Sequence, residues 1–167
     1  MTTIELQPVG PDPLALRSAY GCFPSGVTAI GSIIDGAPDA IIASSFTSVS
    51  LDPPLVSVCV QDNSTTWPKL ANSTRLGVSI LADEHVKACR QIAAKVGDRF
   101  AGLAWTATED GAVLLENAAA WLDCSIYQTF PAGDHVIVVL QVHELLGNPE
   151  ASPLVFHGSS FRQLSTA

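Results

Sequence analysis

Short stretches of β-branched and alternating apolar residues recur along the chain, and turn-forming residues separate them. Gly26–Ile34 is rich in β-branched residues, and Asp35-Gly36 behind it is a typical hairpin signal before Ala40–Ala43. The same pattern predicts further strands at Val49–Leu51, Leu55–Val60, Arg75–Leu81, Ala118–Phe130, His135–Leu146, Pro153–Phe156 and Phe161–Leu164. Many short strands with few helices between them favour a mostly antiparallel β-barrel.

Three short helices are predicted between the strands, each from a capping residue or a proline in its first turn. They run from Pro13 to Phe23, from Thr65 through Ala71, and from Asp83 to Gly97. The chain shows no internal repeat and no linker between domains. We therefore expect a flexible N-terminal arm at residues 1–12 and a single domain at residues 13–167.

The composition limits the partners of the chain. Of its 167 residues, 47% are hydrophobic and 14% are charged, and the formal net charge is −8. Nucleic acids and anionic membranes attract basic patches, so neither is expected as a partner. No apolar run reaches the roughly 18 residues that span a bilayer. The first residues lack the basic and apolar regions of a signal peptide, so a cytoplasmic protein is expected.

The cysteines and histidines do not form a metal-binding pattern. The four cysteines lie far apart among apolar neighbours, and the four histidines lack the HxxxH or HExxH spacing of zinc sites. We therefore expect buried free thiols and no metal site.

The segment Ala43–Val56, ASSFTSVSLDPPLV, places hydroxyl side chains at strand spacing beside a diproline corner. Ser44, Ser45, Thr47 and Ser48, with their backbone amides, form a row of hydrogen-bonding groups that suits a flat polar ligand. An edge strand with a Ser/Thr-rich face before a proline turn has the same composition, so that alternative stays open.

A second polar cluster lies at a predicted helix start. Ser64, Thr65 and Thr66 precede the helix that Pro68 opens, and Lys69 lies one step inside it. Unpaired amides at a helix N-terminus, together with hydroxyls and a lysine, form a natural anion site. An ordinary Ser/Thr helix cap is the alternative.

Three more polar residues are candidates for a site. Arg99 follows a helix and is a second cationic candidate, with a surface ion pair to Asp98 or another nearby acid as the alternative. His135 begins a strand beside Asp134, and either contacts a ligand or is a core residue satisfied by its neighbour. Arg162 stands among apolar residues near the end, in a segment that could also simply close a barrel.

Five stretches together resemble the flavin reductase family, the small partners of two-component flavin monooxygenases. They are FPSGVT at Phe23–Thr28, ASSFTSVSLDPPLV at Ala43–Val56, GDRFAGLAW at Gly97–Trp105, AGDH at Ala132–His135 and PLVFH at Pro153–His157. These stretches occur in family order at family-like spacing. The resemblance covers nearly the whole chain, from about Leu16 to Leu164.

The resemblance implies a fold and an activity. The fold is a mostly β, FMN-binding split β-barrel, Greek-key-like and antiparallel, with a few short helices. The enzyme is a homodimer that uses NADH or NADPH to reduce FMN or FAD, which then leaves for a separate monooxygenase or halogenase. Fixed donors near the reduced flavin stabilise its negative charge, and direct hydride transfer requires no protein nucleophile.

The resemblance also assigns residues to the two ligands. The flavin site comprises Ser44, Ser45, Phe46, Thr47, Ser48, Ser64, Thr65, Thr66, Arg99 and Phe100. Of these, Ser64, Thr66 and Arg99 are assigned to the phosphate end. His135 is assigned to the nicotinamide side, with Arg162 as a second contact. No GxGxxG fingerprint is present, so a Rossmann domain is not expected to hold the nicotinamide cofactor.

Leu76-Gly77-Val78-Ser79 departs from the family pattern, because relatives often have an asparagine in a phenylalanine-led strand there. Two further departures fall at the nicotinamide end. Leu140 stands where a glycine usually interrupts the strand, and Gly158 stands where a basic residue is often found. They favour an alternative, a non-catalytic flavin-binding barrel that has lost its hydride-donor site. A structural barrel without a ligand is a third hypothesis, which treats the Ser/Thr segment and the GDH motif as coincidences.

Overall fold

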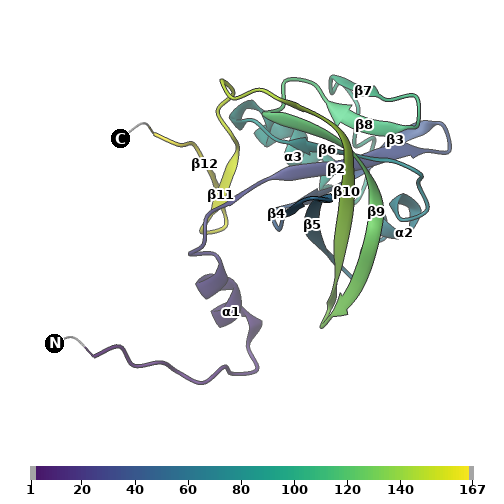
Figure 1. Cartoon of the computed structure of the whole chain (residues 1–167). Helices are drawn as coiled ribbons and strands as arrows, with labels where there is room; N and C mark the ends of the chain where they lie inside the picture. Colours follow the sequence, from purple (N-terminus) through teal and green to yellow (C-terminus); the bar gives the residue numbers. More distant parts are fainter. Residues whose placement is uncertain (1–2, 166–167) are drawn as a thin grey trace.

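A nine-stranded antiparallel sheet carries most of the chain in the computed structural model, which describes residues 3–165 (Figure 1). Its strands are β2 (Thr28–Ile34), β3 (Ala37–Ala43), β4 (Thr47–Leu51), β5 (Pro54–Gln61), β6 (Leu76–Ile80), β7 (Trp105–Ala107), β8 (Ala112–Leu115), β9 (Ala120–Ala132) and β10 (His135–Gly147). They follow the order β4-β5-β10-β9-β6-β2-β8-β7, and β3 pairs with β2. The predicted mostly β fold is confirmed, but no pairing between described residues joins the end strands β4 and β7 into a closed barrel.

The remaining elements are short. A three-stranded sheet has the order β1-β11-β12, with β1 at Ser25–Gly26, β11 at Val155–His157 and β12 at Ser160–Arg162. The helices are α1 (Pro13–Tyr20), α2 (Trp67–Leu70), the 3-10 turn η1 (Asp83–His85) and α3 (Val86–Ile92). The predicted arm at residues 1–12 and the predicted domain at residues 13–167 are described only between Thr3 and Ser165. The first two and last two residues of the chain lie outside the described range.

Two tight turns fix the hairpins of the large sheet. Asp35 and Gly36, with φ of 51° and 81°, join β2 to β3, and left-handed residues suit the twist of a hairpin. Gly133, with φ of 68°, lies in the turn from β9 to β10. The first hairpin was predicted from Asp35-Gly36, whereas Gly133 was predicted only to end a loop before a strand. The second hairpin places His135 at the first position of β10.

Two clusters of buried apolar side chains form the core. The first joins β5, β6 and β10 through residues such as Val58, Leu76, Val138 and Leu140. The second packs α3 against β2, β3 and β8, and Ile92 is fully buried in it. In β10 the alternating residues Val138, Leu140 and Val142 are buried, as their spacing predicts. Each such side chain contributes about 1.5–3 kcal/mol when buried.

Gly77 allows β8 to approach β6 closely. A Cβ at this position would lie 2.1 Å from the backbone carbonyl oxygen of Val113, which is much shorter than a van der Waals contact. Two residues further along β6, the buried Ser79 hydroxyl accepts a hydrogen bond of 2.9 Å from the Leu115 amide. The LGVS sequence of this strand is therefore explained by packing against β8.

The predicted element boundaries failed where local patterns were weak. Strands β7 and β8 were not predicted, because both are short and lie near turn residues. The third helix ends at Ile92 instead of Gly97, and Val96 is 84% exposed. Asp83 lies inside η1, and Ala82 occupies the N-cap position that was predicted for Asp83.

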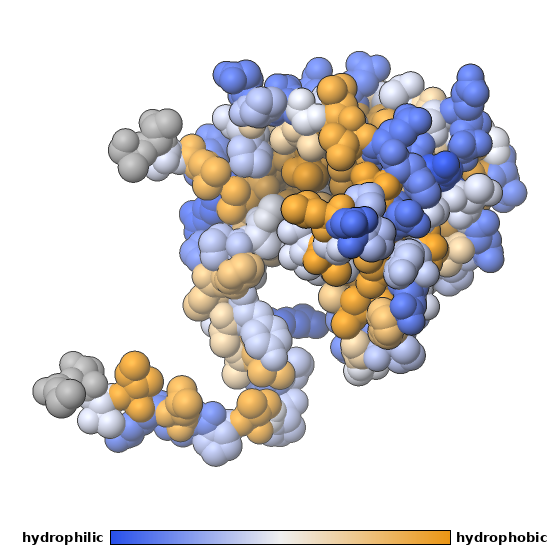
Figure 2. All heavy atoms as spheres, in the orientation of Figure 1, coloured by the Kyte–Doolittle hydropathy of each residue, from blue (hydrophilic) through white to orange (hydrophobic). Residues whose placement is uncertain are grey.

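Helix α1 was predicted correctly at Pro13, but none of its residues is buried. Figures 1 and 2 show α1 and the segment before it standing apart from the sheets, with hydrophobic side chains on their surface. Leu14 and Tyr20 are 65% and 71% exposed, and Ile4 and Leu6 in the preceding segment are almost fully exposed. The apolar stripe of this helix therefore lacks a partner within the described residues.

The cysteine prediction was only half correct. Cys89 and Cys124 are buried free thiols, and burial raises their pKa values to about 11 and about 12. Cys22 and Cys59 are exposed, because neither points into an apolar cluster. Between residues 3 and 165, no helix is long and apolar enough to cross a membrane, and no metal-binding group of three side chains occurs.

Replacing Gly77 with Ala should lower the free energy of unfolding by about 3 kcal/mol or more, because the methyl group collides with the backbone of β8. Gly26→Ala is the matched control, since no atom lies within 4 Å of the position that its methyl group would take. The control should change stability by less than about 0.5 kcal/mol. Urea unfolding measures both. Equal stability of the two variants would contradict the close packing of β6 and β8.

Candidate functional site

A cavity of about 1060 Å³ gathers most of the predicted binding residues. Its walls are the end of β3 with the residues after it, the end of β5, the loop before α2, and the segment after α3. The predicted site residues that line it are Ser44, Ser45, Ser64, Thr65, Thr66, Arg99 and His135. Segments separated by up to about 90 positions in the sequence therefore meet at one place.

The Ser/Thr segment contributes to the cavity only at its beginning. The Ser45 hydroxyl donates to the Cys59 carbonyl at 3.1 Å and accepts from the Cys59 amide at 2.8 Å, which ties this segment to β5. Ser44 lies beside it on the cavity wall. Phe46 packs against the first core cluster instead. Thr47 and Ser48 belong to β4 and do not line the cavity.

The hydroxyl groups before α2 are partly used inside the protein. Ser64 accepts a 3.1 Å hydrogen bond from the Trp67 amide, so it acts as a cap of the first turn. Thr66 occupies the N-cap position without capping through its side chain. Its hydroxyl accepts a 3.2 Å hydrogen bond from Arg99 instead. The helix has only four residues, so its own dipole is a weak source of anion binding.

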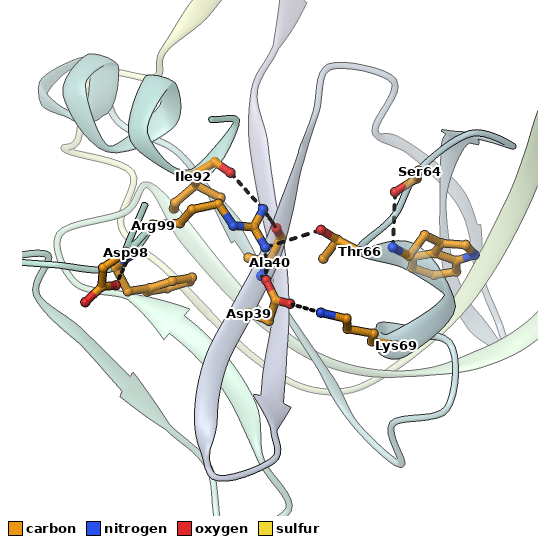
Figure 3. Close-up of polar contacts among 10 residues, drawn as sticks. Asp39, Ala40, Ser64, Thr66, Lys69, Ile92, Asp98 and Arg99 are labelled. Atoms are coloured by element: carbon orange, nitrogen blue, oxygen red, sulfur yellow. Dashed lines mark hydrogen bonds and ion pairs between the residues drawn. The ribbon is translucent and has the colours of Figure 1, made fainter. Parts of the chain in front are cut away.

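Arg99 is the centre of a polar network that Figure 3 shows in full. Its guanidinium donates to the carbonyls of Ala40 at 3.1 Å and Ile92 at 3.0 Å, and to the carboxylate of Asp39. Burial lowers the pKa of Arg99, because the desolvated guanidinium loses hydration. Its acidic partner is Asp39 and not Asp98, whose carboxylate accepts from the Phe100 amide at 3.0 Å.

The cavity lining is cationic, although the chain is acidic. No Asp or Glu is among the described residues that line it, whereas Lys69, Lys95 and Arg99 all belong to its walls. Lys69 is 58% exposed and lies 3.8 Å from Asp39, the carboxylate that Arg99 also contacts. Two neighbouring cations thus share one acid, which leaves a net positive charge at this wall. Such a surface attracts phosphate groups.

His135 stands at the edge of the cavity and is oriented by its neighbour. Its Nδ1 lies 2.7 Å from the Asp134 carboxylate. This hydrogen bond, with the charge of the ring, lowers the pKa of Asp134. Because Nδ1 is held by the acid, Nε2 remains for contact with a ligand. His85, by contrast, is buried and is bonded on both ring nitrogens inside the protein.

Two predicted residues lie elsewhere. Phe100 is buried in the second core cluster, with its ring edge-on to Trp105 at 6.2 Å. Arg162 lines a different cavity, described below. Sequence reasoning did not include Lys95 or Gln61 among the site residues, although both line the first cavity. The position of Lys95 shortly before Arg99, in a segment that ends a helix, was the signal that could have indicated it.

Comparison with known proteins identifies the family. Residues 20–165 match the flavin reductase like domain. The chain is 36% identical over 151 residues to a flavin reductase of Pseudomonas putida, which covers 90% of this chain and 89% of that protein. It is 34% identical over 150 residues to the reductase subunit of a flavin-dependent monooxygenase of Rhodococcus jostii, covering 90% and 77%. The chain belongs to the flavin reductase family.

A solved structure has the same fold as this flavin reductase. The NADH:FAD oxidoreductase of Streptomyces globisporus, in complex with NAD and FAD fragments, superposes with a TM-score of 0.88. The two are 34% identical, and the match covers 96% of this chain and 98% of that one. These comparisons confirm the predicted family and the predicted class of enzyme, an NAD(P)H:flavin oxidoreductase.

Leu140 and Gly158 favoured the alternative of a non-catalytic flavin-binding barrel, and both residues have structural explanations. Leu140 is fully buried in the first core cluster and does not line the cavity. Gly158 has a φ of 56° in the turn between β11 and β12, where a glycine is the least strained residue. Neither departure removes a group from the cavity wall, so neither is specific support for a lost donor site.

Replacing Arg99 with Ala should lower the free energy of unfolding by about 3 kcal/mol, because it leaves a largely buried carboxylate with a weaker partner. If Arg99 also contacts the flavin phosphate, the affinity for FMN should fall by about ten-fold or more. Chemical denaturation and fluorescence titration measure the two effects.

Asp39→Asn separates the two effects of that substitution. It weakens the same network but keeps the guanidinium, so stability should fall while flavin affinity is retained. Lys69→Ala controls for removal of an exposed cation and should change stability by less than about 1 kcal/mol. Equal loss of flavin affinity in the Arg99 and Asp39 variants would show that Arg99 only supports the cavity.

Proposed function

We propose that this chain uses NADH or NADPH to reduce FMN or FAD in the cationic cavity and supplies the reduced flavin to a separate monooxygenase or halogenase. The observation that carries this proposal is the cavity lining, which combines hydroxyls, three cations and, among the described residues, no acid. A flavin phosphate needs such cations, and the ring needs nearby hydrogen-bond donors. The monooxygenase reductase subunit of Rhodococcus jostii supports the delivery of reduced flavin to a partner.

The residues of the chain would act by binding and orienting. Lys69 and Lys95 have ammonium groups on the cavity wall and would hold the flavin phosphate, with Arg99 and Thr66 behind them. Ser44, together with the backbone beside Ser45, would donate toward the ring. When bound, the flavin supplies the hydride-accepting chemistry. The protein's contribution is alignment and a fixed electrostatic environment, so no protein nucleophile is required.

His135 would orient the nicotinamide cofactor. Its side chain is 34% exposed at the cavity edge, and Asp134 fixes its ring. A ring nitrogen that faces the cavity can bond a carboxamide or ribose oxygen of the cofactor. Because hydride transfer depends on alignment, this residue is assigned a positioning task and no obligatory proton transfer.

The sheet would then be an FMN-binding split barrel. The open strand order and the superposition on the Streptomyces globisporus oxidoreductase support this proposal. The predicted homodimer is supported by α1, whose apolar residues have no partner within the described chain, and by the low fraction of charged residues. We propose that a second copy of the chain covers α1.

The activity is tested by mixing the purified protein with FMN or FAD and NADH or NADPH, and following absorbance at the nicotinamide band. The rate at which this absorbance falls, at several concentrations of each flavin, measures turnover. Flavin binding without nicotinamide oxidation would support the non-catalytic alternative, and binding of neither would support a structural barrel.

In the same assay, His135→Ala should raise the KM for NADH by about five-fold, the loss expected from one neutral hydrogen bond, and change kcat less. Flavin affinity should remain. His143→Ala is the control, because this histidine lies on the same strand and bonds Ser125 away from the cavity. A collapse of kcat at saturating NADH would instead assign His135 a direct chemical task.

Light scattering at micromolar concentration should give about twice the chain mass of 17.5 kDa. Replacing Leu14 and Tyr20 with Glu should shift the protein toward the monomer, because charges on α1 would oppose burial. Val96→Glu is the control for each single replacement, since it introduces one carboxylate at an exposed apolar position outside α1. A wild-type monomer that still turns over would refute the homodimer.

A further inference from the structure

A second cavity, of about 660 Å³, also borders α3 and shares no residue with the first. Its lining includes Val86 and Arg90 of α3, and the β11–β12 hairpin supplies most of the rest, including Phe161 and Arg162. The sequence placed Arg162 with His135 in one nicotinamide site. The structure separates them, so Arg162 needs another explanation.

Two guanidinium groups face this cavity without acidic partners. Within residues 3–165, neither Arg90 nor Arg162 takes part in an ion pair or donates a side-chain hydrogen bond. Arg90 lies 5.7 Å from the centre of the Phe161 ring, a cation–π contact that fixes its direction. The one carboxylate on the described wall, Asp83, already accepts from Gln163 at 3.3 Å. The cavity therefore has a net positive charge and unused donors.

The other walls suit a nucleotide. Ser159 and Ser160 supply hydroxyl groups at the turn of the hairpin. Phe156 and Phe161 pack edge to face at 5.5 Å and form an aromatic surface on the same cavity. Guanidinium groups bind phosphate through paired hydrogen bonds, and an aromatic surface binds a flat base.

We propose that this cavity binds the phosphate groups of an adenine nucleotide, with Arg90 and Arg162 as the anion contacts. Two sources have this chemistry, the ADP half of a dinucleotide bound in the first cavity and a separate nucleotide. Both cavities border α3, because Val86 and Arg90 line the second and Ile92 lines the first. The assignment to a dinucleotide rests on the proposed function, whereas the phosphate site does not.

Calorimetric titration of the full chain with ADP tests the site without turnover. Arg90→Gln and Arg162→Gln should each weaken ADP binding about ten-fold, the loss of one charge-assisted contact. Lys87→Gln is the matched control, because Lys87 is an exposed cation of α3 that does not line the cavity. It should change the Kd less than about two-fold. Absence of ADP binding, or equal weakening by Lys87→Gln, would overturn the proposal.

A substitution that keeps both arginines tests the site independently, in case the arginine variants do not fold. Ser160→Asp places a carboxylate in the cavity and should also weaken ADP binding about ten-fold, whereas Ser160→Asn should not. Thermal unfolding of every variant shows whether it is folded. Tight ADP binding by a folded Ser160→Asp variant would contradict a phosphate site at this position.

Steady-state kinetics then distinguish the two sources. If the cavity takes the ADP half of a dinucleotide, Arg162→Gln should raise the KM for FAD or for NADH about ten-fold and leave the KM for FMN unchanged. If it takes a separate nucleotide, all three KM values should stay constant while ADP binding is lost. An inactive wild-type protein that still binds ADP would refute the proposed function and retain the phosphate site.

Discussion

The largely desolvated guanidinium of Arg99 is the interaction on which the first cavity depends. It joins three segments that are distant in sequence, the middle of β3 at Asp39 and Ala40, the end of α3 at Ile92, and the start of α2 at Thr66. A buried carbonyl without a donor is costly, and two of these contacts satisfy such carbonyls, one on the edge strand β3 and one at the end of α3. Removing the guanidinium would release all three walls at once.

The same network explains how an acidic chain presents a cationic surface. With a formal charge of −8, the protein repels anions at long range, but charges act locally inside a recessed surface. Asp39 is placed behind Arg99 and Lys69 and not on the cavity wall, so it orients both cations without meeting a ligand. Selection of phosphate groups then depends on the local arrangement and not on net charge.

The sequence predicted features that are encoded locally. Turn residues such as Asp35-Gly36, the alternation in β10 and the proline at the start of α1 are all read within a few positions, and each was predicted correctly. Features that depend on contacts between residues distant in sequence were not predicted correctly. The pairing of Arg99 with Asp39 spans 60 positions, and Asp98 next to it gave a misleading local alternative. The placement of Arg162 in a second cavity likewise depends on the packing of β12 beside α3.

Residues that differ from the family pattern need not mark a change of function. Gly77 is required because β8 lies within 2.1 Å of the position that a side chain would take, and Leu140 fills the core where β10 crosses the sheet. Neither residue touches the cavity. A departure is informative about activity only when its side chain reaches the site, and the groups that do so here are hydroxyls, cations and one oriented histidine. This set binds and aligns ligands, which is what hydride transfer between two bound rings requires of a protein.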